Sequence, residues 1–137
     1  MPGESLFAAV TANREKVQAH VMMKMDETSG LDVRIERPDG ATVVRLRGDL
    51  DLASCAGLRR TATEDLIRGL VVLDLTELSF CDSSGLRVLL DMQSRAKSGG
   101  AVVRLAGPTS EVGRLLDLSG TRSYFDVYPD VAAALAG

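Results

Sequence analysis

Apolar and polar residues alternate over residues 31–47, and this pattern predicts a pair of half-buried strands. The stretches LDVRIER (31–37) and ATVVRLRG (41–48) place apolar side chains at alternate positions, which is the period of a strand with one covered face. The intervening PDG (38–40) is typical of a tight turn, because aspartate tolerates the turn conformation and glycine supplies a positive φ. We therefore expect an antiparallel hairpin here.

Further along the chain, strand-like runs alternate with helix-like segments. Residues 70–75 (LVVLDL) and 101–107 (AVVRLAG) are almost continuously apolar, as expected of strands covered on both faces of a sheet. A short strand near 123–128 and a small helix from about residue 130 complete the pattern. Three helices are predicted by side chains that recur at spacings of three and four and would share one face: Leu52, Cys55, Leu58, Ala62 and Leu66; Leu86, Leu89, Leu90, Gln93 and Ala96; Val112, Leu115, Leu116 and Leu118.

This order of elements predicts an α/β fold with a mostly parallel central sheet. Strands joined by helices through short links favour right-handed parallel crossovers. The hairpin would add an antiparallel strand at the sheet's edge, and the helices would pack on the sheet. The loop ELSFCDSSG (77–85) is then expected at the carboxyl edge of the sheet, where open α/β folds place functional groups.

Residues 1–30 differ from the rest of the chain and are interpreted as an N-terminal extension to a domain of residues 31–137. Loosely helical spacing of apolar residues predicts either a helix over about 4–25 or a mobile arm. The stretch VMMKM (21–25) leaves open that one of its methionines is the natural first residue. The opening MPGESLFAAV has no basic start and too short an apolar run for a signal peptide.

Composition narrows the possible functions. A chain of 137 residues suits one domain, and 45% apolar with 26% charged residues is typical of soluble globular proteins. The formal net charge of −3 disfavours nucleic-acid binding, and no run approaches the roughly 18 apolar residues of a membrane span. Cys55 and Cys81 are interpreted as buried free thiols of a reducing compartment. We therefore expect a cytoplasmic protein with no direct contact to nucleic acid or membrane.

The stretch FCDSSGLR (80–87) is the strongest candidate for a functional site. Asp82, Ser83 or Ser84 can cap the following helix, because their side-chain oxygens accept hydrogen bonds from first-turn amides. A serine nucleophile needs a nearby base, whereas the single histidine, His20, lies in the extension. Neither a G-x-S-x-G elbow nor an S-x-x-K motif includes this pair. We therefore predict no catalytic residue, and expect that the protein is not an enzyme.

The sequence also argues against a metal or nucleotide site. Histidine and cysteine do not occur at ligand spacing. Acids at predicted strand ends would suit Mg²⁺ as in response regulators. Such a site also needs a lysine later in the chain, but the lysine found there, Lys97, lies inside the end of a predicted helix. These acids are Asp49, Asp51, Asp74 and Asp82. A phosphate-binding glycine loop is not recognisable, so we expect no metal and no cofactor.

A serine at a helix start is, however, a suitable phosphate acceptor. Its hydroxyl lies beside unpaired amides and the positive end of the helix dipole. Phosphorylation would add about −1.5 to −2 charges at neutral pH, and the adjacent Asp82 would sharpen that change. Gly85 would leave room for the approach of a partner. This physical chemistry indicates a switch rather than a catalyst.

Residues 31–136 resemble the STAS family, specifically its small cytoplasmic anti-sigma factor antagonists. Three segments match in order: GDLDLASC (48–55), VVLDLTELSFCDSSGLRVLL (71–90) and GGAVVRLAGPTSEVGRLLDLSG (99–120). The middle segment corresponds to the family's core signature. Two departures are Cys81, where the family usually has a larger or β-branched apolar residue, and Arg87, which adds a positive charge.

The resemblance implies a binding protein controlled by phosphorylation. An unphosphorylated antagonist of this kind binds an anti-sigma factor that is also a serine kinase with a histidine-kinase-like ATPase fold, and binding frees the sigma factor. The kinase phosphorylates the serine after the aspartate, and a PP2C-type phosphatase removes the phosphate. That serine corresponds to Ser83 rather than Ser84. The implied partner-binding residues are Asp49, Asp51, Asp82, Ser84, Gly85, Leu86 and Arg87.

An alternative is a STAS module that works without phosphorylation, as a subunit of a lipid-transport or stressosome-like assembly. Family members in such roles keep the fold, and some keep a serine. An exposed hairpin edge and a detachable first helix would also permit a homodimer.

Overall fold

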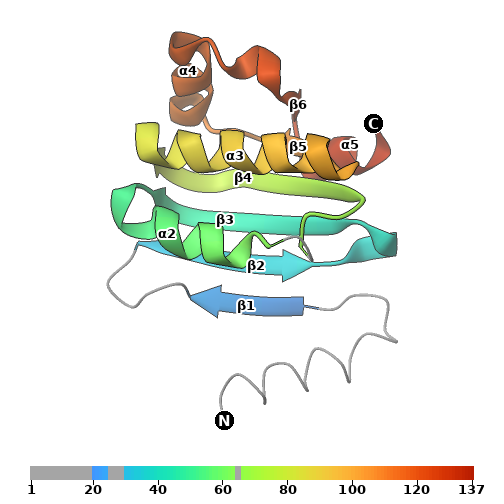
Figure 1. The fold of residues 1–137 in the computed structure, drawn as a ribbon. Helices are drawn as coiled ribbons and strands as arrows, with labels where there is room; N and C mark the ends of the chain where they lie inside the picture. Colours follow the sequence, from blue (N-terminus) through green and yellow to red (C-terminus); the bar gives the residue numbers. More distant parts are fainter. Residues whose placement is uncertain (1–19, 25–29, 64–65) are drawn as a thin grey trace.

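The computed structural model describes residues 20–24, 30–63 and 66–137, and these residues form a single six-stranded sheet. The strands lie side by side in chain order, from β1 to β6 (Figure 1). The first two pairings, β1–β2 and β2–β3, are antiparallel, and the other three are parallel. The strands are β1 (His20–Lys24), β2 (Leu31–Glu36), β3 (Thr42–Leu50), β4 (Leu70–Cys81), β5 (Val102–Ala106) and β6 (Asp126–Tyr128).

In the described part of the chain, four α-helices connect or follow the parallel strands, and a side-chain cap marks the start of each. They are α2 (Leu52–Thr61), α3 (Ser83–Gly99), α4 (Ser110–Ser119) and α5 (Val131–Ala136). Asp51, Asp82, Thr109 and Asp130 each accept a hydrogen bond from a first-turn amide, which satisfies a donor that the helix itself leaves free. Short 3-10 turns, η2 (Pro38–Gly40) and η3 (Arg122–Tyr124), complete the structure.

The helices cover the two faces of the sheet unequally. Because sequential parallel strands are joined by right-handed crossovers, α2, α3 and α4 fall on the same face. Their buried residues form one large core with alternate residues of β2 to β5, including Leu46, Leu73 and Leu105. A smaller cluster on the opposite face contains Ala134 of α5 with Val43, Val72 and Ala106. The predicted α/β fold, with its mostly parallel sheet and antiparallel hairpin, is confirmed.

The face opposite α2 and α3 carries a charged network across β2, β3 and β4. Arg45 Nε donates to Glu36 Oε1 at 2.7 Å, and Arg45 Nη1 donates to Asp74 Oδ2 at 2.5 Å. The other Asp74 oxygen accepts bonds from the amide and hydroxyl of Thr76. Asp74 is only 4% exposed, so its carboxylate is satisfied within the sheet. It lies inside β4, not at a strand end as predicted.

Several predicted boundaries are wrong. β4 continues to Cys81, so most of the predicted loop 77–85 is strand. The helix that begins at Leu52 ends at Thr61, and Leu66 is buried outside it. Leu52 and Leu118 were expected to face the core, yet they are 73% and 76% exposed.

The N-terminal prediction also needs correction. Residues 20–24 form β1, which pairs with β2 in antiparallel register from His20–Glu36 to Lys24–Asp32. The predicted helix over 4–25 is therefore wrong for these five residues, and residues 1–19 lie outside the described part of the chain. Within the described residues, every helix is too short or too polar to cross a membrane.

Candidate functional site

The carboxyl ends of β3 and β4 meet at one edge of the sheet and bring the first turns of α2 and α3 together. Leu50 and Cys81 are partners in the last register position of these two strands. The Asp82 amide donates to the Leu50 carbonyl at 3.3 Å, just beyond the ladder. Both helices therefore start from one fixed junction, and this junction contains the predicted switch.

Asp82 is the cap of α3, which answers a question that the sequence left open. Its Oδ1 accepts a hydrogen bond from the Gly85 amide at 3.0 Å, and its carbonyl accepts one from Leu86. Ser83 is the first residue of the helix and is exposed, and Ser84 is half-buried. Within the described residues, neither serine side chain has a hydrogen-bond partner. Because Asp82 supplies the cap, the Ser83 hydroxyl is free for other chemistry.

Asp49 and Asp51 lie at the neighbouring junction between β3 and α2. Asp51 forms a capping box with Ser54: its Oδ1 accepts from the Ser54 amide at 3.2 Å, and its own amide donates to Ser54 Oγ at 3.0 Å. Ser54 Oγ also donates to the Asp49 carbonyl at 2.9 Å. Both aspartates are half-buried. Asp49 is the second-last residue of β3, and Asp51 caps α2. Asp51 therefore stabilises the start of α2, and a contact of either aspartate with a partner stays a prediction.

Gly85 and Leu86 are not part of the exposed surface, contrary to the prediction. Leu86 is only 6% exposed and belongs to the main core. A Cβ at Gly85 would lie 2.4 Å from the Leu50 carbonyl oxygen and 3.0 Å from Cys81 Sγ. The missing side chain therefore allows α3 to pack against the end of β3 within the chain, and it does not make room for a partner.

A shallow groove of about 370 Å³ runs between α2 and α3 and includes the serine pair. Its lining residues are Leu52, Cys55 and Arg59 from α2 and Ser83, Ser84 and Arg87 from α3. The α2 residues were not predicted as site residues, although their spacing of three and four gives one helical stripe. Leu52 and Cys55 were assigned to the core, and only the structure shows that they and Arg59 border the serines.

Two exposed apolar side chains lie at this edge of the sheet. Leu52 lines the groove and is 73% exposed, and Phe80, two residues before the cap, is 45% exposed. Large apolar groups that remain in water beside charged groups are typical of protein-binding surfaces. This edge of the sheet therefore suits a protein partner better than a small substrate.

The two cysteines differ in burial. Cys55 is buried, and Cys81 is half-buried, so the prediction of two buried free thiols holds only for Cys55. Desolvation, with a further contribution from the charge of Asp82, raises the pKa of Cys81 to about 12. The Cys81 thiol is therefore protonated at neutral pH, and it packs against the start of α3 as a neutral group.

We expect the wild-type protein to lose stability relative to a Cys81→Ala variant as the pH rises above about 9. In the unfolded chain the thiol ionises at its ordinary pKa of 9.0, while the folded protein holds the proton until about pH 12. Between pH 9 and about pH 12, the unfolded state releases the thiol proton and is thereby favoured over the folded state. Below pH 9 the thiol is protonated in both states, so the difference in unfolding free energy between the wild type and Cys81→Ala is constant. Urea unfolding from about pH 7 to about pH 11 measures the free energy of unfolding of both proteins. The same pH dependence in the wild type and in Cys81→Ala would contradict the prediction.

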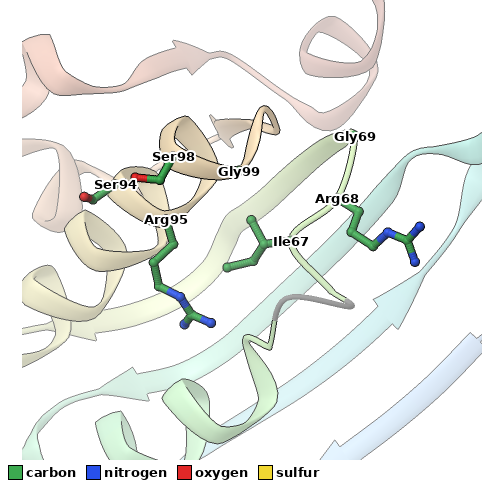
Figure 2. A pocket seen from close by; sticks show the side chains of 7 residues that line it. All are labelled: Ile67, Arg68, Gly69, Ser94, Arg95, Ser98 and Gly99. Carbon is green, nitrogen blue, oxygen red and sulfur yellow. The ribbon is translucent and has the colours of Figure 1, made fainter.

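A second cavity lies at the opposite end of α3 from the serines. It has a volume of about 690 Å³ and is lined by residues around Gly69 and Gly99. Figure 2 shows that the Arg68 side chain points away from Arg95, and that the hydroxyls of Ser94 and Ser98 point away from both guanidinium groups. Because these polar groups do not converge, we assign no ligand to this cavity. Among the described residues, no three or more His, Cys, Asp or Glu side chains are grouped to hold a metal ion.

Comparison with known proteins identifies the family. The model of the STAS domain matches residues 32–134, so the chain belongs to the STAS family. A curated relative, the anti-sigma F factor antagonist of Paenibacillus polymyxa, is 32% identical over 108 residues, which covers 77% of this chain and 92% of the relative. The recognition made from the sequence is confirmed.

Solved structures share the fold. An anti-sigma factor antagonist from Mycobacterium paratuberculosis has a TM-score of 0.71 and 22% identity, with 81% of this chain and 95% of that chain covered. The Bacillus cell fate determinant SpoIIAA is similar in its phosphorylated form (TM-score 0.51, 21% identity, 64% and 81% covered). Its unphosphorylated form is similar too (TM-score 0.54, 23% identity, 64% and 78% covered). At these identities the likeness shows a common architecture.

Proposed function

We propose that this protein is an anti-sigma factor antagonist that phosphorylation of Ser83 switches off. The observation that carries the proposal is the exposed Ser83 hydroxyl at the first position of α3, left free because Asp82 caps the helix. The curated relative is named an anti-sigma F factor antagonist. SpoIIAA, which shares the fold, has been solved in phosphorylated and unphosphorylated forms.

The start of α3 can accept a phosphate without unfolding. The positive end of the helix dipole favours negative charge there, and the exposed side chain leaves the new group in water. The docking surface, in contrast, would gain about −1.5 to −2 charges at its centre. A partner fitted to the neutral serine would then face repulsion and desolvation costs. The modification therefore changes binding and leaves the fold intact.

The proposed partner is an anti-sigma factor that is a serine kinase with a histidine-kinase-like ATPase fold, with a PP2C-type phosphatase to reset the switch. Leu52 and Phe80 supply exposed apolar area for this contact, and Asp49, Asp51 and Arg87 would supply charged groups around it. The six residues that line the groove include neither a histidine nor a carboxylate. Ser83 is therefore suited to be a substrate of the partner, since none of these six groove residues is a base of the kind that activates a serine nucleophile.

Incubation with the cognate kinase and ATP tests this proposal directly. Mass spectrometry of the intact protein should show the addition of one phosphoryl group to the wild type and to Ser84→Ala, and none to Ser83→Ala. Peptide mapping should locate the group on Ser83. Full phosphorylation of Ser83→Ala would refute the assignment. If the kinase binds but transfers no phosphate, the alternative of a phosphorylation-independent STAS subunit would be favoured instead.

A further inference from the structure

Two arginines share the groove with Ser83, and neither has an anionic partner among the described residues. Arg59 extends from the last turn of α2, and Arg87 extends from the first turns of α3. Both are exposed, and neither forms an ion pair with a described carboxylate. Asp91, four residues after Arg87 on α3, lies 4.0 Å from Arg95. Among the residues that the structure describes, the groove thus presents two arginines without an ion-pair partner beside a free hydroxyl.

The positions of these residues on the helices favour one target for both charges. Ser83 and Arg87 are four residues apart on α3 and therefore lie one above the other on the same side of the helix. Arg59 reaches the same groove from α2, in the stripe that also contains Leu52 and Cys55. A group attached to the Ser83 oxygen would project into the space that these side chains border. Guanidinium groups bind phosphate through paired N–H donors.

We propose that Arg59 and Arg87 hold the phosphoryl group of phosphorylated Ser83 within the groove between α2 and α3. The inference rests on the proposed phosphorylation of Ser83. Phosphorylation would then change the docking surface in two ways. It would introduce a dianion, and it would engage two arginines that are otherwise available to a partner. The switch would then act by withdrawing positive charges as well as by repulsion.

The acidic groups around the site work against this contact and must be included in any test. Asp82 caps the helix that begins at Ser83, Asp51 caps α2, and Asp49 lies near the end of β3. Their charges favour the monoanionic form of a phosphate, and the arginines favour the dianionic form. The absolute pKa of the phosphoserine therefore mixes both effects, and only a comparison between variants isolates the arginines.

The test uses full-length protein with phosphoserine incorporated at position 83 during translation, so that no kinase is required. Phosphorus NMR titration gives the second pKa of the phosphate in the wild type, in Arg59→Gln with Arg87→Gln, and in Arg60→Gln. Arg60 is a matched control because it is exposed and adjacent to Arg59, yet it does not line the groove. We expect the double variant to raise the pKa by about 0.5 pH unit relative to the wild type.

Two further observations decide the outcome. The difference should shrink in 1 M salt, where the Debye length is about 3 Å, and Arg60→Gln should titrate like the wild type. Equal pKa values in the wild type and the double variant would overturn the arginine contact. A shift in Arg60→Gln of half that in the double variant or more would also overturn it, because Arg60→Gln removes one charge where the double variant removes two, and such a shift would indicate only a general effect of net charge. Neither result bears on whether a kinase modifies Ser83, which is tested separately.

Discussion

The Ser83→Asp variant should bind the cognate anti-sigma kinase about 100-fold more weakly than the wild type, while Ser83→Ala should bind as tightly as the wild type. A carboxylate at the exposed first position of α3 places a permanent charge at the centre of the docking surface. Such a charge against a fitted interface costs several kcal/mol, and about 3 kcal/mol corresponds to roughly a 100-fold loss. Removing the hydroxyl costs little, since it has no hydrogen-bond partner among the described residues. Isothermal titration calorimetry with the purified kinase measures both.

Ser94→Asp is the matched control for this comparison. Ser94 is an exposed serine of the same helix, about three turns from Ser83. It borders the cavity at the other end of α3 and does not line the groove between α2 and α3. The control should bind like the wild type because the same charge is added outside the docking surface. If Ser83→Asp and Ser83→Ala bind the kinase with equal affinity, the switch is refuted.

Most of the fold could be predicted because local pattern and tertiary context agree. The alternation over 31–47 and the apolar run 70–75 each have one arrangement that buries their side chains, and the structure adopts it. The continuation of β4 to Cys81 was missed because Thr76, Glu77 and Ser79 are exposed. There the strand is held by pairing with the end of β3, which involves Glu77, Leu78, Phe80 and Cys81. Pairing between distant segments leaves little trace in the polarity of either one.

The site was predicted only in part for a similar reason. Ser83 and its cap lie in one contiguous stretch, so sequence reasoning could locate them together. Arg59 is 24 positions before Ser83 and joins the groove only because parallel strands bring α2 beside α3. Leu52 looked like a core residue by spacing, yet it is exposed because it is the first residue of α2, at the edge of the sheet. Helical periodicity identifies a face, but it does not show which neighbour covers that face.

Gly85→Ala is expected to destabilise the protein by about 2–3 kcal/mol, even though alanine favours helices by about 1 kcal/mol over glycine. The added Cβ would lie 2.4 Å from the Leu50 carbonyl oxygen, 2.7 Å from Leu50 Cγ and 3.0 Å from Cys81 Sγ. The nearest of these atoms belongs to backbone, which cannot rotate away as a flexible side chain can. Urea unfolding should show a lower midpoint with an unchanged slope.

Gly99→Ala, at the other end of α3, provides the control for helix propensity. A Cβ there meets no atom within 4 Å, so this variant should be as stable as the wild type or slightly more stable. If Gly85→Ala is as stable as Gly99→Ala, the close approach of α3 to β3 is not required.

If Gly85→Ala is destabilised as expected, the start of α3 must move away from Leu50 to accept the methyl group. That movement would carry Asp82 and Ser83 with it, so kinase binding should weaken in the protein that remains folded. Stability and switching therefore depend on the same contact, because one glycine sets how closely the helix that carries the serine approaches the sheet.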